Sequence, residues 1–150
     1  MGSETDSGEK DYASYRLLVD LWAGENPVKT AKLLVLLATN ALLIAAMALA
    51  GGPVPGNWPI CLAGAGFSLV WALSLGRTVL FQDLWRLKIR EIAARHPADA
   101  RFQVLDTRGE REKAPVLLRM MGAIPSAYYL LGTPLLLLIL WLGALAFLLL

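Results

Sequence analysis

Charged side chains occur in only two segments of this chain, and two long stretches carry none. Residues 33–76 form an uncharged stretch of 44 residues, and residues 123–150 form one of 28. A helix of about 20 apolar residues crosses the roughly 30 Å hydrocarbon core of a bilayer. The first stretch is therefore long enough for two spans with a turn, and the second for one. The pattern predicts an all-α membrane protein with three transmembrane helices.

Turn residues place the ends of these spans. The run GGPVPGNWP at 51–59 is dense in Gly and Pro, which favour turns. It divides a transmembrane hairpin, 28–76, into spans at about 28–50 and 59–76. Gly122 and Pro125 precede the third transmembrane helix, 126–150, in which Pro134 should produce a kink.

The second span should extend beyond the bilayer. Neither Gly nor Pro occurs between Gly76 and His96, and the helical pattern of apolar residues continues, so one helix should reach about Arg95. Residues 77–122 then form a cytoplasmic helix and loop module. Within it, FQVLD at 102–106 could pair as a short strand, and 114–121 is typical of a short interfacial helix.

The N-terminal residues differ in character from the spans. Residues 1–10 are rich in Gly, Ser and acidic side chains, which predicts a disordered tail. Residues 11–24 should form an N-terminal amphipathic helix that ends at 25–27, because Tyr15, Leu18, Val19 and Trp22 recur at helical spacing. Two placements remain open: in the headgroup layer, anchored by Trp22, or docked on the cytoplasmic module.

The distribution of basic residues predicts the orientation. Ten Lys and Arg lie between the second and third spans, and none lies between the first and second. Basic residues near spans stay in the cytoplasm. The N-terminus should therefore be cytoplasmic and the C-terminus outside, in a multi-pass protein of the cell (inner) membrane.

Small residues recur along the second span. Gly64, Ser68, Ala72 and Gly76 follow one another at intervals of four and share one helix face. Small side chains allow two helices in lipid to approach closely. This row predicts a helix-packing seam, either between subunits or against another span of the same chain.

Asn40 is the one amide side chain predicted to lie within the hydrocarbon region. An unpaired amide is costly there, so it should face protein or water. Two interpretations remain open: a hydrogen bond between helices, or a position lining a pore.

The cytoplasmic part of the second helix combines an apolar stripe with basic side chains. Leucines and aromatic residues at 80–92 need a partner, which could be the 11–23 segment, the 114–121 segment or another subunit. Beside them, four residues are candidates for cytoplasmic contact with a protein partner, anionic lipid or a phosphorylated ligand: Trp85, Arg86, Lys88 and Arg90. The alternative is that these charges only fix the topology.

Composition excludes several functions. Of the 150 residues, 57% are hydrophobic and the net charge is +2, which does not favour a nucleic-acid partner. The single His, His96, precedes a proline, and the single Cys, Cys61, lies in an apolar stretch. No metal-ligand spacing, nucleophile–base pair or phosphate-binding Gly loop is present, so we expect no enzyme activity and no cofactor.

The order of these segments resembles small, largely uncharacterised bacterial three-helix integral membrane proteins, some of which lie near anti-phage defence genes. The matching features are the DYASYRLLVDLW helix, Asn40 in the first span, Trp71 in the second, Asp83, Leu84, Lys88 and Ile89 in the helix after it, and Ile124-Pro125 before the third. The resemblance implies an effector or accessory subunit without catalytic residues.

Together these features predict a homo-oligomeric protein in contact with the lipid bilayer. Its cytoplasmic module would receive a signal or partner, and its spans would perturb or permeate the membrane. The alternative is a passive membrane anchor or an accessory subunit of a larger complex.

Overall fold

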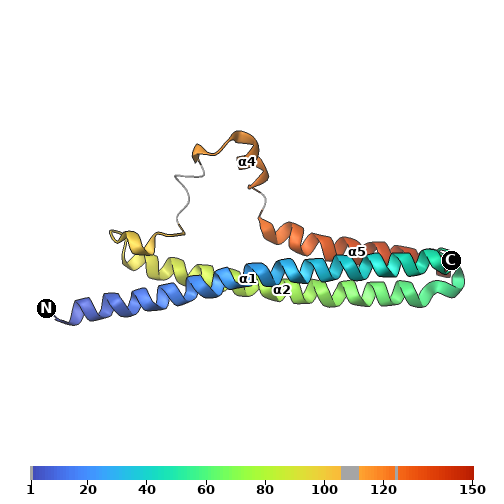
Figure 1. The fold of residues 1–150 in the computed structure, drawn as a ribbon, viewed down its shortest axis with the longest axis horizontal. Helices are drawn as coiled ribbons and strands as arrows, with labels where there is room; N and C mark the ends of the chain where they lie inside the picture. The colour runs from blue at the N-terminus through green and yellow to red at the C-terminus, as the bar shows by residue number, and fades with distance from the viewer. Residues whose placement is uncertain (1, 106–111, 124) are drawn as a thin grey trace. The chain divides into compact units, whose positions relative to one another are not determined.

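The computed structural model describes residues 2–105, 112–123 and 125–150, and the described residues contain helices and turns but no strand. The elements, in order, are α1 (Gly2–Leu49), the 3₁₀ helix η1 (Pro55–Asn57), α2 (Trp58–Arg95), the 3₁₀ helix η2 (Ala100–Phe102), α4 (Val116–Met121) and α5 (Ser126–Leu149) (Figure 1). Three of them, α1, α2 and α5, are long and apolar enough to cross a membrane. The predicted all-α fold with three helices of membrane-spanning length and composition is confirmed.

The chain forms two compact units. Unit 1 comprises Met1–Asn26 and Leu80–Pro125, and unit 2 comprises Pro27–Val79 and Ser126–Leu150. Both α1 and α2 contribute residues to each unit.

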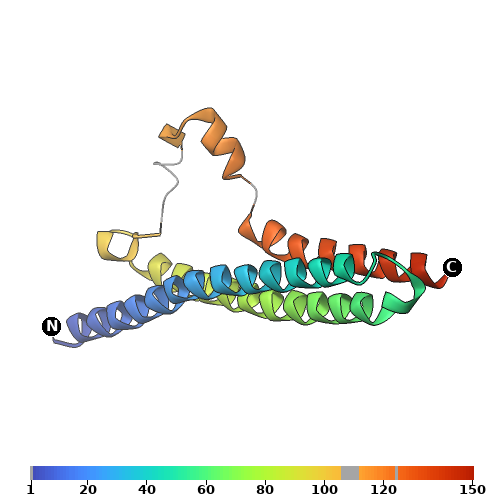
Figure 2. The same ribbon diagram turned by 45° about the vertical axis from the view of Figure 1, so that its right-hand side comes forward.

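Unit 2 is a bundle of the apolar parts of α1, α2 and α5, which lie side by side in both views (Figures 1 and 2). On α2, Gly64 lies against Trp141 of α5 and Gly76 lies near Leu131. Because the residue numbers increase in opposite directions, α5 runs antiparallel to α2. The buried core at one end of this bundle contains Cys61, Ala65, Trp141 and Leu148.

Buried positions in unit 2 recur every seven residues on all three helices. The set is Lys29 and Leu36 on α1, Cys61, Ser68 and Leu75 on α2, and Pro134, Trp141 and Leu148 on α5. A seven-residue repeat corresponds to 3.5 residues per turn and produces left-handed supercoiling, with side chains interlocked along the seam. The helices of unit 2 therefore pack in the manner of a coiled coil.

Unit 1 has a small aromatic core around Phe102. The chain leaves α2 at Arg95, and η2 then places Phe102 against Tyr15 of α1 and Ile89 of α2, where all three side chains are buried. Further apolar residues of α1, among them Leu18 and Trp22, pack on this core. Of the two placements left open for 11–24, docking on the segment after the second span is the one these contacts favour.

A glycine turn joins α1 to α2. Gly51 and Gly52 have φ angles of +91° and +85°, a region that side chains disfavour. The amide of Asn57 donates to the carbonyls of Ala50 (3.0 Å) and Gly52 (2.8 Å), which closes the turn. The predicted turn at 51–59 is present, and α2 begins inside it at Trp58.

The predicted disordered tail at 1–10 and the predicted break at 25–27 are wrong, because α1 is helical from Gly2 to Leu49 with Pro27 inside it. A proline leaves a helical carbonyl without its N–H donor. For Pro27 this is the carbonyl of Ala23. Gln82 of α2 donates to the carbonyl of the preceding residue, Trp22 (3.1 Å), and to the side chain of Asn26 (3.3 Å). These hydrogen bonds join α1 to α2 beside the proline, and α1 is helical on both sides of it.

Other segment predictions have mixed outcomes. The continuation of the second helix to about Arg95 is confirmed by α2, and a short helix within 114–121 is confirmed by α4. The strand at 102–106 is wrong for the residues described, since Phe102 ends η2 and 104–105 form a turn. Asp106 and Ile124 lie outside the described residues.

Candidate functional site

A polar contact lies inside the apolar bundle of unit 2. The indole N–H of Trp141 donates to the side-chain oxygen of Asn40 over 2.6 Å, and the Asn40 amide donates to the carbonyl of Leu36 over 2.9 Å. Asn40 is 2% exposed. Both ends of its side chain are therefore paired within the chain, and of the two interpretations of Asn40 this arrangement favours the hydrogen bond between helices.

The predicted small-residue row divides between neighbours. Gly64 and Ser68 are buried, whereas Ala72 and Gly76 are only partly buried. A Cβ on Gly64 would fall on the ring of Trp141, but a Cβ on Gly76 would make only an ordinary contact, 3.7 Å from Leu131. A row with four-residue spacing drifts around a helix whose packing repeats every 3.5 residues. The row therefore supplies one close approach, at Gly64, and not a continuous seam.

Ser68 occupies the buried seven-residue repeat without a polar partner. Its side chain is fully buried, and its hydroxyl forms no hydrogen bond within the part of the chain that the structure describes. Serine and threonine hydroxyls in a helix can donate to a backbone carbonyl of the preceding turn. Thr78 does so, to the carbonyl of Ser74 at 3.2 Å, but Ser68 does not. The small volume of Ser68, and not its polarity, is what the packing of unit 2 uses.

The α2 part of unit 1 has an inner and an outer face. Gln82 and Ile89 are buried against α1, whereas Leu80, Leu84 and Leu87 are 58%, 45% and 61% exposed. No described segment of the chain covers this leucine row. In particular, neither the 11–23 segment nor α4 does so. Gly64 and Ser68, earlier on the same helix, are buried, so the exposed leucine row does not continue their line.

The four predicted contact residues lie on the same stretch of α2 as this leucine row. Trp85 is partly buried, and its ring lies 6.0 Å from that of Phe81. The side chains of Arg86, Lys88 and Arg90 are exposed, and none of them forms a hydrogen bond or ion pair with the described residues. By contrast, Arg95 pairs with Glu91 at 2.8 Å, a surface pair of small energetic value.

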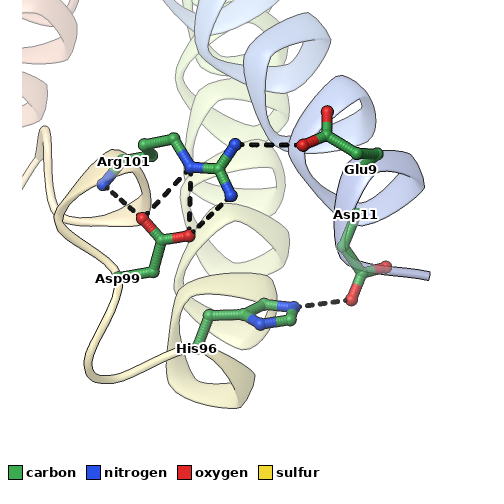
Figure 3. Close-up of polar contacts among 5 residues, drawn as sticks. All are labelled: Glu9, Asp11, His96, Asp99 and Arg101. Carbon is green, nitrogen blue, oxygen red and sulfur yellow. Dashed lines mark hydrogen bonds and ion pairs between the residues drawn. The ribbon is translucent and has the colours of Figure 1, made fainter. Parts of the chain in front are cut away.

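Five polar residues connect the segment after α2 to α1 (Figure 3). His96 Nε2 lies 2.9 Å from Asp11 Oδ2. Arg101 donates to Asp99 through its backbone N–H (3.0 Å) and its guanidinium (2.8 Å), and also to Glu9 (3.2 Å). The His96 ring stacks on Phe102 at 4.4 Å. These contacts hold η2 on α1.

The charges of this cluster reinforce one another. Hydrogen bonds from the Arg101 side chain, and then from its backbone, lower the pKa of Asp99 below its ordinary value of 3.8. The same carboxylate, followed by Glu9, raises the pKa of Arg101 above its ordinary value. Both side chains therefore stay charged through the neutral range. The His96–Asp11 and Arg101–Glu9 contacts of this cluster dock η2 on α1.

Basic residues gather at one end of unit 2. Lys29 is 8% exposed and lies one helical turn before Lys32 on α1. Lys32 Nζ donates to the hydroxyl of Thr78 on α2 over 2.8 Å, and Arg77 adjoins Thr78 in the chain. The sequence had identified these cations only as markers of the cytoplasmic ends of the spans.

Metal chemistry has no support in the described part of the chain, where no group of three or more His, Cys, Asp or Glu residues could hold an ion.

Sequence reasoning missed three residues that organise the fold: Trp141, Phe102 and Gln82. The signal for Trp141 was its seven-residue interval from Pro134 and Leu148. Phe102 has no such signal, because its position depends on how the loop after α2 folds back.

No family model, curated protein or solved structure matches this chain. The resemblance to small bacterial three-helix membrane proteins stays a prediction. The function must therefore be argued from the chain's own contacts.

Proposed function

We propose that this chain is a homo-oligomeric integral membrane protein of the bacterial inner membrane. Unit 2 would lie in the bilayer, and unit 1 would lie on the cytoplasmic side, where it receives a signal or a protein partner. The basis for this orientation is the distribution of Lys and Arg, with ten between the second and third spans (77–125) and none between the first and second. The N-terminus is then cytoplasmic and the C-terminus outside.

The observation that carries the proposal is the exposed leucine row on α2. Leu80, Leu84 and Leu87 alternate at intervals of four and three, which is the spacing of the apolar d, a and d positions of a coiled-coil heptad. Leaving large apolar side chains in water forgoes roughly 1.5–3 kcal/mol each. Because no described segment of the chain covers them, we assign the row to the α2 helix of a second copy.

Charges beside the row match a parallel pair of α2 helices. Copies inserted the same way in one membrane have parallel α2 helices. In that register Asp83 is at position g and Lys88 at position e, five residues later, and such g–e′ pairs form salt bridges between parallel helices. Each Asp83 would thus meet Lys88 of the other copy, twice per dimer.

The same register predicts that the seam is short. Glu91 falls at the next a position, and Arg90 would face Arg95 of the other copy, so the favourable contact ends after Leu87. A seam of about one heptad is weak enough to respond to a bound partner. Arg90, at position g, borders it, whereas Trp85 and Arg86, at positions b and c, point away from it; these three residues would carry that partner contact.

In this proposal any perturbation or permeation of the membrane occurs between copies. Within one copy, the Asn40–Trp141 hydrogen bond pairs the buried amide of Asn40 inside unit 2. The same hydrogen bond supports a second candidate function, a passive membrane anchor or accessory subunit of a larger complex, since it makes unit 2 a closed bundle.

A charge-swap experiment tests the proposal. Asp83→Lys and Lys88→Asp should each weaken self-association in a mild detergent, and the double swap should restore it, measured as molecular mass by light scattering. Arg16→Glu, a charge reversal on the exposed part of α1, is the matched control and should change nothing. Single swaps that leave the mass unchanged would refute the seam.

Membrane potential in cells expressing the same variants separates the two functions. If the protein acts on the membrane as an oligomer, potential-sensitive dye should report depolarisation with the wild type and the double swap but not with the single swaps. The alternative result is that the wild type, both single swaps and the double swap all leave the potential unchanged, while the single swaps weaken self-association and the double swap restores it. In that case the anchor or accessory function is correct.

A further inference from the structure

Unit 2 contains cations but no acidic residue. Its only charged side chains are Lys29, Lys32 and Arg77, whereas all 12 Asp and Glu residues of the chain lie in unit 1. Unit 2 therefore has a net charge of +3. Two of these cations lie three residues apart on one face of α1, where like charges repel.

A hydrogen bond between helices holds Lys32 of α1 at Thr78 of α2, the residue next to Arg77. Thr78 donates its own hydroxyl proton to the carbonyl of Ser74 and accepts from Lys32 Nζ at 2.8 Å. An ammonium group has three N–H donors, so Lys32 keeps two for another acceptor. Arg77, the next residue to Thr78, is exposed and adds a planar guanidinium suited to phosphate oxygens.

An apolar strip leads from this contact along the bundle. Val70, Leu73 and Arg77 fall at intervals of three and four and so share one side of α2. Val70 is 63% exposed and Leu73 is 68% exposed. The strip thus presents two exposed apolar side chains followed by a cation. A phospholipid has the same order, with apolar acyl chains followed by a charged phosphate.

We propose that this end of unit 2 binds the phosphate of an anionic phospholipid. Lys32 and Arg77 contact the phosphate oxygens, Lys29 strengthens the positive field, and an acyl chain lies along Leu73 and Val70. The site requires that unit 2 be embedded in a bilayer, but it does not depend on self-association or on a cytoplasmic partner.

Native mass spectrometry of the full chain in detergent tests this site. The protein is mixed with phosphatidylglycerol or with phosphatidylcholine of the same acyl chains. We expect the phosphatidylglycerol-bound form to dominate. Arg77→Gln and Lys32→Gln should each reduce its population about fivefold, the effect expected of one basic residue at an anionic lipid. Lys32→Arg, which keeps the charge, should retain binding.

Controls separate this site from general attraction and from a free ion. Arg16→Gln removes one exposed positive charge from unit 1 and should leave binding unchanged, and melting temperatures without lipid verify that each variant folds. Equal binding of the two lipids overturns the proposal, as does an Arg16→Gln loss as large as that of Arg77→Gln. Competition by glycerol phosphate at the lipid concentration would identify a free phosphate as the ligand and also overturn it.

Discussion

Trp141 of α5 donates its indole N–H to the side chain of Asn40 in α1, 101 residues earlier in the chain, across 2.6 Å in the interior of unit 2. This hydrogen bond fixes the third helix against the first. The Trp141 ring also fills the space that Gly64 leaves on α2. One side chain therefore contacts both other helices of the bundle, which makes it the residue on which the packing of unit 2 most depends.

A double-mutant cycle on this pair should reveal their coupling. We expect Trp141→Phe and Asn40→Leu each to destabilise the protein and their combination to cost less than the sum, with a coupling of about 0.6–1.7 kcal/mol, as for other hydrogen bonds between membrane helices. Unfolding in mixed detergent micelles measures it. Trp71→Phe, the same exchange at a partly buried site on α2, is the control. Strictly additive effects would show that the two side chains act independently.

Gly64 and Gly66 provide a matched pair of substitutions two residues apart. A Cβ at Gly64 would overlap the Trp141 ring, whereas a Cβ at Gly66 has nothing within 4 Å. Gly64→Ala should therefore destabilise the bundle by about 1–3 kcal/mol through overpacking. Gly66→Ala should be neutral or slightly stabilising, because alanine favours helix over glycine. Equal melting temperatures for the two variants would contradict the contact.

Phe102 should be essential to unit 1. It is 2% exposed and touches Tyr12, Tyr15 and His96 through its ring. Phe102→Ala should cost about 3–5 kcal/mol locally, as for large aromatic residues in cores. Hydrogen exchange in the segment around η2 should then accelerate, while exchange in unit 2 is retained. Val104→Ala, at a residue 65% exposed, should leave the rates unchanged.

The docking of η2 should also depend on pH, because Arg101 lowers the pKa of Asp99. A carboxyl whose pKa is lower in the folded state stabilises the fold above its ordinary pKa and loses that contribution as the pH falls through the lowered value. We therefore expect the contribution of Asp99 to stay constant from neutral pH down to the ordinary value of 3.8, and to weaken only below it. An NMR titration of the carboxyl carbon measures the pKa, and Arg101→Gln should raise it toward the ordinary value.

The sequence was sufficient to predict the helices of this fold, because long uncharged stretches and the GGPVPGNWP turn are local features. It was not sufficient to locate the packing seam. The four-residue row from Gly64 was visible in the sequence, but the buried repeat is seven residues, as Cys61, Ser68 and Leu75 show. Small residues indicate where helices can approach, and only the packing of all three helices determines which approaches occur.

Two other differences between the prediction and the structure arise from contacts between residues far apart in the sequence. Pro27 and its neighbours predicted a helix end, but Gln82, more than 50 residues later, supplies hydrogen bonds at that point. Local propensity could not anticipate these contacts with a neighbouring helix. Similarly, the role of Asn40 was left open between a pore and a hydrogen bond between helices, since its partner Trp141 lies in another span.

The topology of the three spans is the claim on which the rest of the account depends, and cysteine labelling tests it most directly. In a Cys61→Ala background, one cysteine replaces Ser7 and, in a second variant, one is added after Leu150. A membrane-impermeant maleimide applied to intact spheroplasts should label the added C-terminal cysteine at once and the cysteine at position 7 only after lysis. Labelling of both variants from the same side would contradict three membrane-spanning helices.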